Sequence, residues 1–464
     1  MSGPPPAAAE TLSRFAGELR FDGSPPDVAE KAKLLFLDYF GIALAARRGE
    51  FDAPLRRAAR ALTGGGGGPC SAVGEGEGMP PGGAALLNGA LGHALDFDDT
   101  HTASIIHTAA AAAPAALAGA EAAGRGGREM VRVLVAAFEV LIRIGLAAPG
   151  RFHARGFHMT ALAGTFGAAL AFGLLTGLEG RRLASALGVA GSLAAGLMEF
   201  LEDGSPVKAL HPGWAAHAGI AAATLAAGGF GGPATVLEGR FGLLRSHLGE
   251  EPFDAAALTD GLGERWETRA TAFKPYPCGH VIHAFLDAAL AAQAEGEFEA
   301  DAIESVVCHA AKGAIDLVLE PAEAKRRPRT AYDGKFSLPY CLGSVFVRGR
   351  CGVDEFSAEA VRDPRVLEVA AKVSHRRDDG QDYPRFFPGK VEVRLRDGRV
   401  FAAEEKRQRG CPENPISAAE VRAKFMDNAR RALPAARAEE LADRIARLET
   451  LDTLEPVGEI LREA

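Results

Sequence analysis

Between Pro81 and Ala227 the chain repeats one pattern, and this pattern limits the possible folds more than any other feature of the sequence. Apolar stretches of roughly ten to twenty residues follow one another, separated by glycine-rich or charged breaks such as GRGGRE and LEGRR. No run alternates between polar and apolar residues, as a half-buried strand would require. The segment therefore predicts consecutive helices in a large all-α domain.

One stretch of this segment, Gly156 to Leu178, is uncharged apart from its histidine and is long enough to cross a bilayer. It is rich in Ala, Gly and Thr, has no aromatic belt, and carries His158 near its start. We therefore expect a central helix that is packed on all sides, and no membrane insertion.

The pattern changes near residue 268. Ile303 to His309, Gly389 to Leu395 and Val400 to Glu405 have the composition of strands, and Arg396-Asp397-Gly398 predicts a hairpin turn between the last two. A helix is expected over Ser337 to Val347. The charged run HRRDDGQD between them is expected to be exposed.

Amphipathic helices return after residue 412, over Ser417 to Leu433 and Ala436 to Leu448. The predicted fold is therefore mainly α. Residues 1–267 and 409–464 form a large all-α helical domain, and residues 268–408 form a smaller α+β lid domain inserted into it.

Charge and cysteine content exclude several classes of protein. The net charge of −8 argues against a nucleic-acid partner, whose binding surface would be basic. Six cysteines lack any metal-binding spacing, so they are expected to be reduced thiols. The first residues, MSGPPPAAAE, do not have the charged and apolar regions of a signal peptide and resemble a frayed end. Together these features predict a cytoplasmic protein.

Polar side chains are concentrated between Leu91 and His107, although the flanking segments are apolar. The segment contains three carboxylates, a hydroxyl and several imidazoles: Asp96, Asp98, Asp99, Thr100, His93, His101 and His107. Carboxylates rarely stay buried without partners, so such a cluster between apolar runs indicates a site. A solvated loop that caps a helix is the alternative.

Further candidate groups lie in four other segments. The list is His158 in GFHMTALAGT, Lys208 in SPVKALHPGW, Lys274 and His280 in FKPYPCGHVIH, and Tyr340 in KFSLPYCLG. Each has a structural alternative: a helix cap, a lysine that reaches solvent, a proline-rich linker, or core packing. The histidine spacings match neither HExxH nor a Cys/His finger, so no metal site is expected.

This inventory of carboxylate, imidazoles, hydroxyl and two lysines suits proton abstraction next to a carboxylate. Removing that proton places negative charge on the carboxylate, and nearby cations stabilise the charge as it forms. A general base takes the proton, while an imidazole or hydroxyl protonates the departing oxygen. No motif for nucleotide binding or acyl transfer is present.

Four segments, in order and spread over nearly the whole chain, resemble the MmgE/PrpD family. They are LNGALGHALDFDDTH, KALHPGWAAHAGIAA, FKPYPCGHVIHAFLDA and GCPENPISAAEVRAKF. The family includes 2-methylcitrate dehydratases, cis-aconitate decarboxylases and iminodisuccinate epimerases. The run DFDDTHTASIIHTAAAAAP differs from the 2-methylcitrate dehydratase pattern and favours a less highly charged substrate.

The resemblance implies a homodimer that works without metal or organic cofactor, with its site in the cleft between a helical domain and a lid. The matching positions are Asp96, Thr100, His158, Lys208 and Lys274, and the looser matches are His107 and Tyr340.

We therefore expect a cofactor-independent lyase, with dehydration of a small hydroxy di- or tricarboxylic acid as the first reaction considered. Asp96, His158, Lys208 and Lys274 are the expected catalytic residues, and the substrate-binding residues are Thr100, His107, His280 and Tyr340. An epimerase, a decarboxylase, and a catalytically silent helical scaffold remain alternatives. The scaffold predicts that the two lysines lie far from Asp96.

Overall fold

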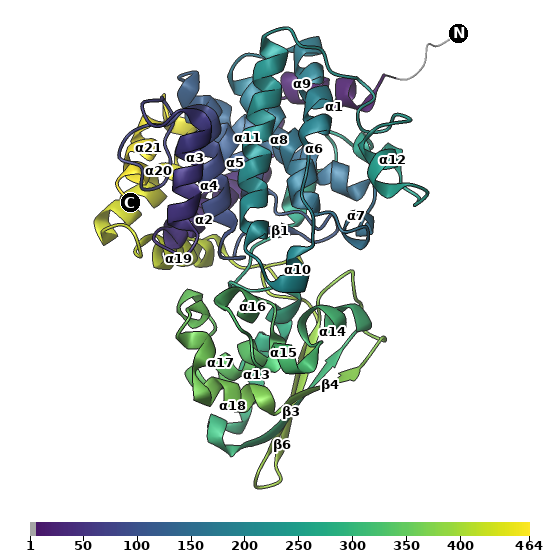
Figure 1. Cartoon of the computed structure of the whole chain (residues 1–464), viewed down its shortest axis with the longest axis vertical. Helices are drawn as coiled ribbons and strands as arrows, with labels where there is room; N and C mark the ends of the chain where they lie inside the picture. Colours follow the sequence, from purple (N-terminus) through teal and green to yellow (C-terminus); the bar gives the residue numbers. More distant parts are fainter. Residues whose placement is uncertain (1–5) are drawn as a thin grey trace.

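The computed structural model describes residues 6–464 and shows a mainly helical protein (Figure 1). Residues 1–5, part of the end predicted to be frayed, lie outside the described residues. The first helix, α1, already begins at Ala8. The part of the predicted frayed end from Ala8 onward is therefore helical.

The first part of the chain is a series of helices, as predicted from Pro81 onward. They are α1 (Ala8–Glu18), α2 (Pro26–Ala46), α3 (Asp52–Thr63), α4 (Pro81–His93), α5 (Ala109–Ala122), α6 (Gly127–Leu146), α7 (Arg151–Ala154), α8 (Met159–Leu175), α9 (Gly180–Leu193), α10 (Phe200–Asp203), α11 (Val207–Ala227) and α12 (Leu243–Leu248). Every residue of α8 is buried, so the central packed helix is confirmed. Among residues 6–464, no helix combines the length and the apolar character needed to cross a membrane.

The order of α4, α8 and α11 in space is set by close backbone contact. Helix α11 packs against both α4 and α8. At the α4–α11 crossing, a Cβ on Gly89 would lie 2.6 Å from the Cα of Gly213. Only glycine lets the two helices approach this closely, and the approach brings the start of α11 to the end of α4.

A four-stranded sheet forms the second part, in the order β4-β3-β5-β6. Its strands are β3 (Ile303–Ala310), β4 (Val373–Arg377), β5 (Gly389–Leu395) and β6 (Val400–Glu405). Strands β3, β5 and β6 were predicted. Strand β4 was not, because it carries the start of the charged run that was expected only to be exposed; charged residues suit an edge strand that faces solvent.

Helices surround this sheet and return to the first part at the end of the chain. They are α13 (His283–Gly296), α14 (Lys312–Val318), α15 (Ala322–Arg326), α16 (Ala331–Lys335), α17 (Leu338–Arg348), α18 (Pro364–Ala371), α19 (Ala418–Ala429), α20 (Ala435–Ala446) and α21 (Glu455–Arg462). In Figure 1 the sheet and α13–α18 lie below the main group of helices, whereas α19–α21 lie beside α2–α4.

Two hydrophobic cores correspond to these two groups of elements. The first contains side chains from α1 to α12 together with Val421, Phe425 and Leu441 of the last helices. The second extends from Tyr276 to Leu395 and contains the inner face of the sheet. The chain therefore leaves one core, builds another and returns. The exact domain boundaries and the role of the second part as a lid stay predictions.

A short pair of strands joins two segments that carry candidate residues. Strand β1 (Thr100–His101) pairs antiparallel with β2 (Thr271–Ala272), and Thr100 lies opposite Ala272. Lys274 follows β2 by two residues, so this pairing holds it beside the segment that follows α4.

Candidate active site

Asp96 is the centre of the candidate site and is bonded to two lysines from distant parts of the chain. It is buried in the loop after α4, with a φ of 52° that aspartate tolerates better than most residues. Lys208, near the start of α11, pairs with one carboxylate oxygen. Lys274 donates to the other oxygen at 3.1 Å and to the backbone carbonyl of Asp96 at 2.9 Å.

Two ammonium groups thus share one carboxylate. Burial alone would raise the pKa of Asp96, but Lys208 and Lys274 hold it well below its usual value. Asp96 is therefore ionised, and the group of three carries one excess positive charge.

The other two aspartates of the segment, Asp98 and Asp99, hydrogen-bond to a histidine and to a helix start. Asp98 Oδ2 lies 2.7 Å from Nδ1 of His93. The Asp99 carboxylate accepts from the backbone N–H of Thr108 at 2.6 Å and of Ala109 at 3.1 Å, at the start of α5. Asp99 therefore binds the first turn of α5, but it is buried and is not part of the solvated loop that the alternative described, while Asp96 takes part in the lysine pairs.

Three imidazoles lie together next to this group. The ring centres of His93 and His107 are 4.7 Å apart, and those of His93 and His158 are 5.7 Å apart. His107 Nδ1 lies 2.8 Å from the carbonyl of Asp99, and His158 Nδ1 lies 3.0 Å from Nδ1 of His211.

Burial makes His107, His158 and His211 weak bases. It lowers the pKa of His158 well below its usual value, and the charge of Lys208 lowers it further. Burial likewise lowers the pKa of His107 well below the usual value, against the opposing charge of Asp98. Burial also lowers the pKa of His211, to about 4. These rings are neutral near pH 7 and have lone pairs that can accept a proton.

The remaining expected residues are placed differently from one another. The Thr100 hydroxyl is buried without a hydrogen-bonding partner among the described residues, and the same holds for both ring nitrogens of His280. Burial, together with the charge of Lys274, lowers the pKa of His280 to about 3.

Tyr340 is not brought to this cluster. It is fully buried in the second core, and its hydroxyl donates to the backbone carbonyl of Glu355. The substrate-binding role expected for Tyr340 is therefore not supported by its position. Tyrosine is partly apolar, and here tertiary packing placed it in the core.

Two residues of α16 that were not singled out do reach the site. Lys335 Nζ donates to the carbonyl of Leu95 at 2.8 Å and to that of Pro277 at 3.0 Å. Burial lowers its pKa to about 8, opposed by the charge of Asp96. Burial raises the pKa of Tyr332, and Asp96 and Asp98 raise it further. Lys335 begins the KFSLPYCLG segment that supplied Tyr340, so that segment was the available signal.

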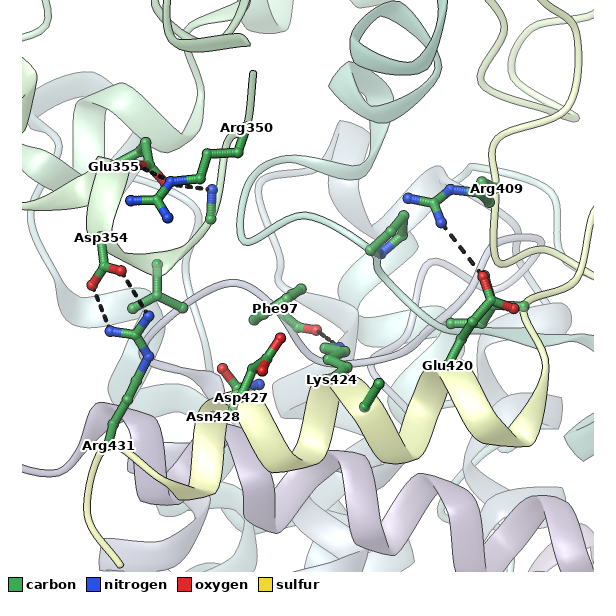
Figure 2. Close-up of a pocket in the computed structure, with 15 residues that line it drawn as sticks. Phe97, Arg350, Asp354, Glu355, Arg409, Glu420, Lys424, Asp427, Asn428 and Arg431 are labelled. Atoms are coloured by element: carbon green, nitrogen blue, oxygen red, sulfur yellow. Dashed lines mark hydrogen bonds and ion pairs between the residues drawn. The ribbon is translucent and has the colours of Figure 1, made fainter. Parts of the chain in front are cut away.

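A cavity of about 580 Å³ lies between α19 and the loop that follows α17 (Figure 2). Its wall includes Phe97 and Pro275, the chain neighbours of Asp96 and Lys274. Each of its cations has a carboxylate partner: Arg350 with Glu355 at 3.0 Å, Arg409 with Glu420 at 3.7 Å, Lys424 with Asp38 at 2.8 Å, and Arg431 with Asp354 at 2.6 Å. It therefore lacks the excess positive charge found at Asp96.

A second cavity, of about 390 Å³, is lined by residues that contact the site but not by Asp96, Lys208, Lys274 or the histidines. Phe336 and Phe200 line it. The ammonium of Lys208 lies 5.3 Å from the ring centre of Phe336, and the ring of Phe200 is 6.4 Å from that of His158. Tyr332 lines the same cavity.

A bridged carboxylate beside neutral imidazoles, held between a helical core and a sheet-containing core, agrees with the family models that match the chain. The MmgE/PrpD N-terminal domain matches residues 10–256, and the MmgE/PrpD C-terminal domain matches residues 276–450. The chain belongs to the MmgE/PrpD family.

Curated relatives share about a quarter of their residues with this chain. A cis-aconitate decarboxylase of Aspergillus terreus is 28% identical, over 97% of this chain and 95% of the relative. The cis-aconitate decarboxylase of Mus musculus is 27% identical over 83% of this chain and 79% of the relative. That of Homo sapiens is 28% identical over 83% and 80%. The homodimer and the cytoplasmic location stay predictions.

Proposed function

We propose that this chain is a cofactor-independent lyase that acts on a small polycarboxylic acid through a carbanion formed next to a carboxylate. One observation carries the proposal: Lys208 and Lys274 meet at a single buried carboxylate, Asp96. The excess positive charge attracts a substrate carboxylate, and it stabilises that carboxylate most when carbanion charge has spread onto it.

Decarboxylation is the first reaction to test, because the relatives that match this chain are named cis-aconitate decarboxylases. The C–C bond to the departing carboxylate breaks and carbon dioxide leaves. The electron pair stays on the substrate and spreads onto a retained carboxylate, beside Lys208 and Lys274. A proton that His107 or His158 has taken from water then adds to carbon, so the reaction consumes one proton.

Dehydration is the second candidate, and the neutral state of the imidazoles favours it. An imidazole with a lowered pKa is unprotonated near pH 7, so His158 can remove a proton next to the substrate carboxylate. A second group then protonates the departing hydroxyl. The Thr100 hydroxyl and the ring nitrogens of His280 have no hydrogen-bonding partner among the described residues. We propose that they orient the substrate.

The scaffold alternative required the lysines to lie far from Asp96. Lys274 instead donates to its carboxylate at 3.1 Å, and both lysine side chains are buried. Placing two cations and a carboxylate out of water costs several kcal/mol per ion. In a purely structural protein no function offsets this cost. In a catalyst of carbanion formation the same charges stabilise the carbanion.

The test is a set of acids followed by NMR in deuterated buffer: cis-aconitate, citrate, 2-methylcitrate and simpler hydroxy acids. Release of carbon dioxide marks decarboxylation, loss of water marks dehydration, and deuterium exchange without net change marks epimerisation. Lys274→Met is the inactive comparison, and Lys312→Met, whose side chain is 61% exposed on α14, is the matched control. The proposal fails if no acid reacts, or if Lys274→Met reacts as fast as the wild type.

A further inference from the structure

His93, His107 and His158 lie closer together than their roles as separate proton carriers require. One ring nitrogen of each lies within 4.8 Å of a ring nitrogen of each of the other two. They come from the end of α4, the segment before α5 and the residue that precedes α8. Their sequence spacing matches no metal-binding motif, which is why none was predicted; only the packing of three helices brings them together.

The hydrogen bonds of the three rings leave one nitrogen of each free to bind an ion. Nδ1 of His93 faces the Asp98 carboxylate at 2.7 Å, and Nδ1 of His107 faces the Asp99 carbonyl at 2.8 Å. A carboxylate and a carbonyl only accept, so both rings carry their proton on Nδ1 and their lone pair on Nε2. Nε2 of His93 is buried and has no hydrogen-bonding partner among residues 6–464.

His158 can present the same nitrogen. Its Nδ1 lies 3.0 Å from Nδ1 of His211, so when it donates to His211 its Nε2 carries the lone pair. Metal-binding histidines generally have this arrangement, in which the second ring nitrogen is held by a carboxylate, a carbonyl or another acceptor. Here all three rings have such a partner.

The positive charge of Lys208 and Lys274 repels a cation at the three rings less strongly than two isolated lysines would. Lys208 and Lys274 both pair with Asp96, which offsets half of their charge. Asp98 adds a second carboxylate on the side of the rings, 2.7 Å from His93 and 3.5 Å from His107. A cation at the three nitrogens would therefore lie beside an ionised carboxylate.

We propose that His93, His107 and His158 form a binding site for one divalent cation of the zinc class, and that occupancy inhibits the enzyme. Three imidazole ligands suit Zn²⁺, Co²⁺, Ni²⁺ or Cu²⁺ and do not suit Mg²⁺ or Ca²⁺. Metal–nitrogen bonds of about 2.0–2.1 Å place tetrahedral ligands about 3.3 Å apart, so the rings close inward on binding. The inhibition rests on the proposed function, because the bound ion occupies the lone pairs that would transfer protons. Metal binding itself does not depend on the proposed function.

Binding is measured on the metal-stripped full-length protein. Co²⁺ is titrated while its visible spectrum is recorded, Zn²⁺ is titrated by calorimetry, and Mg²⁺ serves as the unsuitable ion. We expect one Co²⁺ or Zn²⁺ per chain, a tetrahedral Co²⁺ spectrum and no Mg²⁺ binding. His93→Gln and His107→Gln should each weaken binding by at least about 10-fold, the lower end of what loss of an outer-shell partner costs a metal site.

His217→Gln is the matched control, since His217 lies on α11 and its Nδ1 is 3.1 Å from the Gly82 carbonyl, outside the cluster. Circular dichroism confirms that each variant is folded. Wild-type protein that binds no Co²⁺, or binding unchanged in both cluster variants, would overturn the site. Failure of every acid to react would refute the proposed function and leave this titration unaffected. An active enzyme that binds Zn²⁺ without losing activity would overturn the inhibition.

Discussion

Lys274 contacts Asp96 twice, through the backbone carbonyl at 2.9 Å and through the carboxylate at 3.1 Å. The first contact fixes the backbone of the loop, and the second leaves the ammonium exchangeable with a substrate carboxylate. Asp96 thereby keeps two cations together in a buried place where they would otherwise repel each other. Charge balance at this residue leads to the first prediction.

Asp96→Asn is expected to destabilise the protein more than Lys274→Met does. The asparagine leaves Lys208 and Lys274 buried without a counterion, which costs about 3–5 kcal/mol of the free energy of unfolding. Lys274→Met leaves one carboxylate with one ammonium, a balanced pair. Both should lower kcat/KM by about 100- to 1000-fold, the effect of losing one donor to a developing anion. Urea unfolding and initial rates measure the two effects; equal stability of the two variants would contradict the charge argument.

Lys335 is expected to act as a positioning residue for the site. It joins α16 to the carbonyls of Leu95 and Pro277, which lie one residue before Asp96 and three after Lys274. Lys335→Met should lower kcat by at least about 10-fold, since small misplacement of catalytic groups is costly. Its pKa of about 8 predicts that activity falls as the pH rises through 8, because the neutral amine holds the carbonyls less strongly.

The pH profile separates this role from a general loss of stability. The fall in activity above pH 8 should be present in the wild type and in Lys312→Met, and absent from the remaining activity of Lys335→Met. If Lys335→Met keeps the same fall, another group is responsible, and Lys31, whose pKa burial also lowers to about 8, is the one to examine.

Acid should destabilise the fold below pH 6.5. Burial lowers the pKa of His153 and His211 to about 4, while unfolded histidine keeps a value near 6.5. The unfolded chain therefore binds more protons between these values, so this stability is full above pH 6.5 and is lost as the pH falls toward 4. Each such group contributes up to about 1.4 kcal/mol per pH unit.

Some buried carboxyls act in the opposite direction. Burial raises the pKa of Asp99 and Glu121 to about 7, and their stabilising effect is present at low pH and lost as the pH rises through 7. Eight histidines have a lowered pKa and four carboxyls a raised one, so the histidines decide the sign. Thermal unfolding from pH 7.5 to 4.5 should show a falling Tm; a Tm that rises toward pH 4.5 would refute this.

Tyr332→Phe and Tyr340→Phe should have opposite effects. Tyr332 lines the cavity next to Lys208, and the charges of Asp96 and Asp98 act on it, so loss of its hydroxyl should lower kcat/KM with little change in stability. Tyr340→Phe removes a buried hydrogen bond to the Glu355 carbonyl and should cost about 1 kcal/mol of stability with activity kept. The reverse result would restore Tyr340 to the site.

Much of the architecture follows from local sequence. The apolar stretches between Pro81 and Ala227 form helices because each is long enough and apolar enough to bury, and β5 and β6 coincide with their predicted ranges because period-2 patterning and a glycine turn act over short distances. Strand β4 was missed because its charged residues say nothing about the parallel pairing to β3 that makes it a strand. Parallel partners are set by the fold, not by neighbours in the chain.

The same division holds for the site. The sequence singled out Asp96, His158, Lys208 and Lys274, because polar groups inside apolar runs are costly and because these positions match the motifs of the family. Tertiary structure alone decided that both lysines share one carboxylate, that Lys335 joins them while Tyr340 does not, and that three histidines meet. The sequence specifies which side chains carry charge or can transfer protons. The distance between residues more than a hundred positions apart is fixed only once the helices and strands have packed.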